Sequence, residues 1–173
     1  MFYELHRAIS PVNGGLRIDY RVTSHRDAPM PFLWAAHPQF VAPAGSHLVV
    51  DCATVVDALD APDERRAWTP ELAGIDTVPA GGCRKIYADP DEPVGSVSLV
   101  VPDAGELTLR WDPTLTPYVG LWFDQGAYAR KPVIAIEPST GFYDSLAGAI
   151  GNDRVLWVEP GLPVSWWVEV TAA

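Results

Sequence analysis

Apolar and polar residues alternate along three stretches of the chain, at residues 16–23, 107–111 and 164–170. In the first stretch Leu, Ile, Tyr and Val occupy every second position, and Arg, Asp and Thr fill the positions between them. A period of two puts all the apolar side chains on one face of a β-strand, whereas a helix needs a longer period. Each stretch is therefore predicted to be a strand with one buried and one solvated face.

Largely apolar runs at residues 97–101, 118–123 and 133–136 are bounded by proline or glycine. They are too short for helices, so we expect buried strands. The 17 prolines and 14 glycines are spread evenly and interrupt the chain at short intervals. This spacing favours a sandwich or barrel of antiparallel strands over alternating strands and helices.

The fold class that follows is all-β, a single antiparallel β-sandwich domain over residues 1–173. A chain of this length buries roughly 70% of its unfolded surface, which is enough for a substantial core. Irregular structure is expected at residues 57–82, and residues 145–150 are expected to form at most a helical turn or two.

The net charge of the chain argues against several classes of binding partner. Twelve Lys and Arg against 22 Asp and Glu give a formal net charge of −10. A chain this acidic is repelled by phosphate backbones and anionic lipids, so we expect neither a nucleic-acid partner nor a membrane partner. No apolar run approaches the roughly 20 residues that span a bilayer.

Location is predicted from the N-terminal residues and the cysteines. The first residues lack the basic flank and apolar stretch of a signal peptide. Cys52 and Cys83 are too few for a disulfide framework and lack metal-type spacing. We therefore expect two reduced thiols in a cytoplasmic protein.

Two segments depart from an ordinary strand pattern, residues 31–40 and 133–141. In the first, His37 ends an apolar, aromatic run and is followed by proline; in the second, Glu137 ends an apolar strand and is again followed by proline. Either residue alone is better explained as structural or solvated. Together, two strands that end in a titratable group can bring both groups to one rim of a sandwich, where an acid and a base can transfer protons.

Seven tryptophans are more than packing requires, and an indole can stack on the apolar face of a sugar ring. Trp34 and Trp122 are close in sequence to the two unusual segments, so they are predicted to line or adjoin the same cavity. Trp111 and Trp166 lie in alternating stretches and are predicted to be core residues. The sequence contains no Gly-rich phosphate loop, nucleophile elbow or His-x-x-x-His pair, and the four histidines are scattered, so we expect no metal.

Three motifs in order resemble the aldose 1-epimerases (galactose mutarotases). The sequence His-Pro-Gln-Phe at residues 37–40 is similar to the family segment with the general acid. Residues 121–123 followed by Glu137 and the sequence Pro-Ser-Thr-Gly are similar to the strand with the general base. Residues 156–168 are similar to the family's final strand.

The resemblance implies a shortened galactose-mutarotase-like supersandwich that acts on the anomeric centre of a free hexose. It implies that His37 is the general acid and Glu137 the general base, with no cofactor. Arg84 or Lys85 falls near the position where the family often has a sugar-binding aspartate, so both are predicted to bind substrate.

The resemblance covers only the second half of the family's usual length. Substrate-contacting residues of the first half, an arginine and a histidine, have no counterpart before Met1, which implies weak activity. Strand edges and apolar faces that the first half would cover are expected to be covered in a homodimer. Two alternatives stay open at this point: a non-catalytic carbohydrate-binding module with the same fold, and a structural β domain that works through protein contacts.

Overall fold

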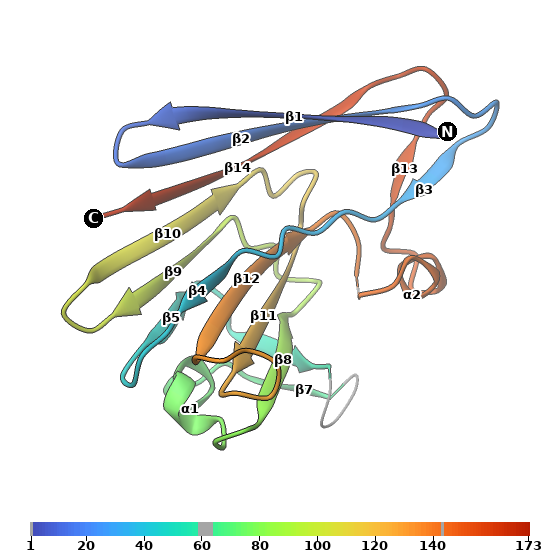
Figure 1. Ribbon diagram of the computed structural model, residues 1–173. Coiled ribbons are helices and arrows are strands. Elements are labelled where there is room, and N and C mark those ends of the chain that lie inside the picture. The colour runs from blue at the N-terminus through green and yellow to red at the C-terminus, as the bar shows by residue number, and fades with distance from the viewer. Residues whose placement is uncertain (1, 59–63, 143) are drawn as a thin grey trace.

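The computed structural model describes residues 2–58, 64–142 and 144–173, which form two facing six-stranded sheets and a small two-stranded sheet (Figure 1). The first sheet has the order β1 (Tyr3–Val12), β2 (Gly15–Ser24), β14 (Val164–Ala172), β10 (Gly105–Trp111), β9 (Ser96–Val101), β5 (His47–Val50). The second has the order β4 (Gln39–Val41), β12 (Val133–Ser139), β11 (Tyr118–Asp124), β8 (Cys83–Ala88), β6 (Thr54–Asp57), β7 (Arg65–Ala67). The third pairs β13 (Leu156–Val158) with β3 (Met30–Phe32).

Neighbouring strands in all three sheets run antiparallel. The three alternating stretches lie in β2, β10 and β14, and the three apolar runs lie in β9, β11 and β12. Trp111 and Trp166 are each 2% exposed, so both are core residues as predicted. The predicted all-β sandwich is confirmed for the described residues.

Helical structure in the described residues is limited to α1 (Pro70–Ala73), the 3-10 turn η1 (Ile75–Thr77) and α2 (Leu146–Gly151). The hydroxyl of Ser145 caps α2 by accepting a hydrogen bond from the Gly148 N–H at 3.0 Å. In the segment 57–82, residues 59–63 lie outside the described residues, and the rest is more ordered than predicted because it contains β7, α1 and η1. No helix in the described part of the chain is long and apolar enough to cross a membrane.

Strand β1 was not evident from the sequence, because Arg7 and Pro11 interrupt its apolar positions. It pairs with β2 along its whole length through a two-residue turn, in which Gly14 has a φ of +76°. Proline is tolerated because β1 is an edge strand. In Figure 1 this hairpin lies at the end of the first sheet that the second sheet does not reach.

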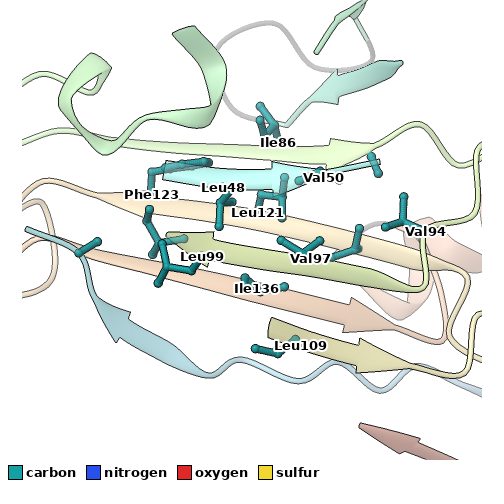
Figure 2. Packing of buried hydrophobic residues seen from close by; sticks show 14 of the residues in the cluster. Leu48, Val50, Ile86, Val94, Val97, Leu99, Leu109, Leu121, Phe123 and Ile136 are labelled. Atoms are coloured by element: carbon teal, nitrogen blue, oxygen red, sulfur yellow. The ribbon is translucent and has the colours of Figure 1, made fainter. Parts of the chain in front are cut away.

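The main core fills the space between the two large sheets. Leu48 and Leu99 of the first sheet lie opposite Leu121, Phe123 and Ile136 of the second, and all five are at most 2% exposed (Figure 2). A smaller cluster around Trp166 lies beneath β3 and β13. Because successive residues of a strand point to opposite faces, burial of the inner face of β11 and β12 determines which of their side chains lie on the outer face of the sheet.

Replacing Leu121 by alanine removes a fully buried side chain between the sheets, so we expect a loss of about 2–5 kcal/mol in the free energy of unfolding. The matched control is Leu162→Ala, because Leu162 is 62% exposed and should cost less than about 0.5 kcal/mol. Urea denaturation of both variants measures the difference. Equal losses would contradict the assignment of the core.

Candidate active site

The outer face of the second sheet, opposite the core, carries the unusual polar residues. In β12 the side chain of Ile136 points into the core, so the next residue, Glu137, points to the outer face. In β8, Ile86 points inward and its neighbours Lys85 and Tyr87 point outward. Glu137 is nevertheless only 4% exposed. A carboxylate has thus been placed at a buried position outside the hydrophobic core.

His37 reaches this face from the segment that connects β3 to β4. The Ala36 N–H donates to the Pro138 carbonyl at 3.0 Å, and Ala35 forms a bridge with Ser139. These contacts align the segment with β12, and they place His37 Nε2 3.2 Å from Glu137 Oε1. The two residues therefore face one cavity, as the sequence predicts.

The cavity has a volume of about 230 Å³. Its lining includes Leu33, Ala35 and Ser139 beside His37 and Glu137. The His37 side chain is about half exposed, whereas that of Glu137 is 5% exposed. The histidine can therefore move at the mouth of the cavity while the carboxylate stays fixed at its floor.

Lys85 balances the charge of Glu137. Its Nζ donates a hydrogen bond to Glu137 Oε2, and both side chains are almost fully buried. Glu137 Oε1, in contrast, accepts no hydrogen bond from any described residue. His37 Nε2 lies within ion-pair distance of Oε1 but outside hydrogen-bond geometry. One oxygen of the carboxylate is thus engaged by Lys85, and the other is buried beside His37 without a hydrogen bond from the described residues.

Tyr87 and Asp144 complete the polar cluster, and sequence reasoning assigned a role to neither. The Tyr87 hydroxyl donates to Asp144 Oδ1, which also lies 3.3 Å from Lys85 Nζ. Phe142 packs edge-on against Tyr87 with 5.2 Å between ring centroids. The sequence held one signal for the place of Tyr87. It follows Lys85 by two residues on a strand, and residues two apart on a strand lie on the same face.

The two predicted tryptophans are not among the residues that line this cavity. Trp122 lies on the same outer face, directly opposite Lys85 in the β8–β11 register, and packs against Tyr128 at 5.6 Å. Trp34 points inward and packs against Trp166 with 5.3 Å between ring centroids. Trp34 and His37 both line a neighbouring groove of about 670 Å³. Trp122 therefore lies beside Lys85, which is itself not among the residues that line the cavity, and Trp34 lines the neighbouring groove.

The structure does not bring Arg84 to the cavity. Adjacent residues of a strand point to opposite faces, so Arg84 points away from Lys85. Its guanidinium lies 4.4 Å from the centroid of the Phe123 ring and donates to the Leu72 carbonyl at 2.6 Å. Arg84 anchors the segment around α1, and Lys85 is the residue of this pair at the cavity.

The described residues contain no cluster of three or more His, Cys, Asp or Glu side chains that could hold a metal ion. Cys52 is a free thiol. Burial, reinforced by the negative charges of Glu92, Asp51 and Asp89, raises the pKa of the Cys52 thiol to about 11. Cys52 is therefore protonated at neutral pH and is not a nucleophile there.

Solved structures with the same fold cover almost the whole chain. The Slr1438 protein from Synechocystis sp. PCC 6803 matches with a TM-score of 0.79 and 20% identity over 99% of this chain and 55% of that one. A galactose mutarotase-like protein from Lactobacillus casei ATCC 334 matches with a TM-score of 0.70 and 19% identity, covering 99% of this chain and 63% of that one. Another, from Clostridium acetobutylicum, matches with a TM-score of 0.72 and 14% identity over 99% and 56% of the respective chains.

The chain therefore has the galactose mutarotase-like sandwich fold, and almost all of it matches a part of each of these longer chains. It spans a little more than half the length of these structures. No protein-family model and no curated protein sequence matches it.

The elevated pKa of Cys52 predicts slow alkylation at neutral pH. In a Cys83→Ser variant, the rate of reaction of Cys52 with iodoacetamide should rise with pH toward a midpoint near 11. The same variant in denaturing urea should show a midpoint near the ordinary value of about 8.5. A midpoint below 9 in the folded protein would contradict the effect of burial.

Proposed function

We propose that this chain is an aldose 1-epimerase-like protein that interconverts the anomers of a free hexose. The observation that carries the proposal is the buried carboxylate of Glu137, whose free Oε1 lies 3.2 Å from His37 Nε2 in a cavity. The shared fold with mutarotase-like structures supports the same reaction class. The ligand is a small sugar, and the reaction is acid–base chemistry by these two side chains.

In the proposed reaction Glu137 Oε1 takes the proton of the anomeric hydroxyl, and protonated His37 donates a proton to the ring oxygen. The bond between C1 and the ring oxygen breaks as the C1 carbonyl forms, and the chain rotates about C1–C2. Attack of the new hydroxyl on the other face of the carbonyl closes the ring. The proton transfers then run in reverse, so both residues return to their starting states. Each positioned transfer contributes roughly 10²–10⁴-fold in rate.

The sugar has to enter between the two catalytic groups. His37 is the movable partner because its side chain is half exposed on a connecting segment, whereas Glu137 is fixed on β12. Rotation of the imidazole makes room for the anomeric carbon and its two oxygens. The site would thus be completed when the substrate binds, which agrees with the absence of a hydrogen bond at Oε1.

The second candidate function is a non-catalytic carbohydrate-binding module of the same fold. The low sequence identity of 14–20% to the mutarotase-like structures favours it, because a fold shared at that level does not carry a catalytic activity with it. Tryptophan fluorescence during a hexose titration detects binding in either case. Polarimetry of freshly dissolved α-glucose or α-galactose then separates them, because only an epimerase accelerates the approach to anomeric equilibrium.

Glu137→Gln should lower the mutarotation rate by more than about 10²-fold, because the amide keeps the shape of the side chain but cannot accept the proton. The control is Glu159→Gln, which changes an exposed glutamate. Circular dichroism verifies that both variants fold, and polarimetry gives the rates. A Glu137→Gln variant with the wild-type rate would assign the base to another residue.

We also propose a homodimer formed through β1, and a cytoplasmic location, because two cysteines are too few for a disulfide framework. β1 is paired on one side only, and the apolar face that it shares with β2 is uncovered. Leu5, Ile9 and Leu16 are 41%, 57% and 50% exposed, although the same face of the sheet carries the core further along. Unpaired edges of this kind are templates for another strand.

A second copy of β1 fits this edge. If two β1 strands pair antiparallel about a two-fold axis at Leu5, Leu5 of each copy lies opposite Leu5 of the other. The same register puts Glu4 opposite His6, and both side chains point to the solvent face. The pairing would therefore match apolar side chains on one face and complementary polar side chains on the other.

Light scattering coupled to gel filtration at micromolar concentration should give twice the mass of the chain. Leu5→Asp should give the monomer, because two carboxylates would face each other at the centre of the interface. Leu162→Asp is the matched control, at an exposed leucine away from β1, and should stay dimeric. A monomeric wild-type protein would contradict the proposed interface.

A further inference from the structure

The buried lysine of the candidate site reaches across a whole strand to meet the glutamate. The order of the second sheet is β12-β11-β8, so β11 separates Lys85 from Glu137. Two strand spacings amount to about 10 Å between the backbones of β8 and β12. Lys85 therefore lies over β11, and its Nζ still reaches Glu137 Oε2.

Gly120 occupies the crossing point on β11. It is paired with Glu137 on one side and with Tyr87 on the other. A Cβ at this position would lie 3.1 Å from Tyr87 Cε1, 3.2 Å from Lys85 Cε and 3.3 Å from Lys85 Nζ. Gly120 is not among the glycines with a positive φ, so its backbone conformation does not require glycine. Its importance is the space: a Cβ here would force the Lys85 side chain or the Tyr87 ring to shift by a few tenths of an ångström.

The ammonium group is committed to protein groups. Lys85 is 5% exposed, it donates to Glu137 Oε2, and its Nζ lies 3.3 Å from Asp144 Oδ1. It also lies 5.3 Å from the centroid of the Tyr87 ring. A buried ion pair is costly to form and strongly destabilising to break on one side only, so this contact fixes the carboxylate in one orientation.

We propose that Lys85 is a positioning residue rather than a substrate-binding one. Its ammonium engages Glu137 Oε2, so that Oε1 faces His37 and the anomeric hydroxyl, and Gly120 provides the path for its side chain. This inference rests on the proposed epimerase function. Its consequence is that substitutions at two positions outside the cavity lining alter the chemical step.

The charge of Lys85 gives the proposal a signature in the kinetics. The titratable groups that face Glu137 are His37 from the connecting segment, Lys85 and Tyr87 from β8, and Asp144 from the loop before α2. Lys85 is the fixed cation among them. Without it, Glu137 and Asp144 lose their shared counter-charge, and Oε2 of the base loses the group that holds it. The loss should therefore appear in the chemical step rather than in substrate binding.

The test uses Lys85→Met in the full chain, with Lys131→Met as the control, since Lys131 is an exposed lysine away from the cavity. Polarimetry should show kcat reduced roughly 10²-fold in Lys85→Met, the scale of a misplaced catalytic group. KM for the hexose should change little. Lys131→Met should match the wild type in both quantities.

A second variant, Gly120→Ala, keeps the charge but obstructs the path of the lysine. It should also lower kcat with little change in KM. If Lys85→Met does not fold, Gly120→Ala provides the test instead. An increase in KM with unchanged kcat in Lys85→Met would overturn the inference and make Lys85 a substrate-binding residue. Wild-type kinetics in both variants would overturn it as well. A wild-type chain without mutarotase activity would instead overturn the proposed function, and this inference with it.

Discussion

The ion pair between Lys85 and Glu137 constrains much of the second sheet. Two opposite charges removed from water are stable only with close contact and further hydrogen-bonding partners. The pair spans three strands, so it requires β8 and β12 to flank β11 in a fixed register, and Gly120 leaves room for the lysine side chain at the crossing. The inner faces of the same strands are held by the core. Apolar packing on one face and one buried ion pair on the other thus fix the position of the carboxylate.

The same arrangement separates the roles of the two candidate catalytic groups. Glu137 belongs to a central strand and is held by Lys85, whereas His37 belongs to a connecting segment held to β12 by backbone contacts. A rigid base and a movable acid suit a reaction in which the substrate must enter between them. In the proposed reaction, proton transfer then depends on Glu137 Oε1, the carboxylate oxygen that accepts no hydrogen bond from the described residues.

The sequence predicted the layers well because alternation and short apolar runs depend on burial, which is a local property of each strand. It also predicted that His37 and Glu137 meet, because both end apolar segments. It missed β1, where Arg7 and Pro11 break the pattern at an edge. It did not separate Arg84 from Lys85, since adjacent residues differ only in the face to which they point. Lys85 crossing over Gly120 depends on the order of strands distant in sequence, which no local pattern contains.

The central claim is that the free oxygen of Glu137 receives the anomeric hydroxyl of a sugar. A crystal structure with a bound hexose tests it most directly. The account predicts the anomeric oxygen within hydrogen-bond distance of Glu137 Oε1 and the ring oxygen within reach of His37 Nε2, with Lys85 still on Oε2. A hexose bound in the groove beside Trp34 or elsewhere, with its anomeric carbon away from Glu137, would contradict it.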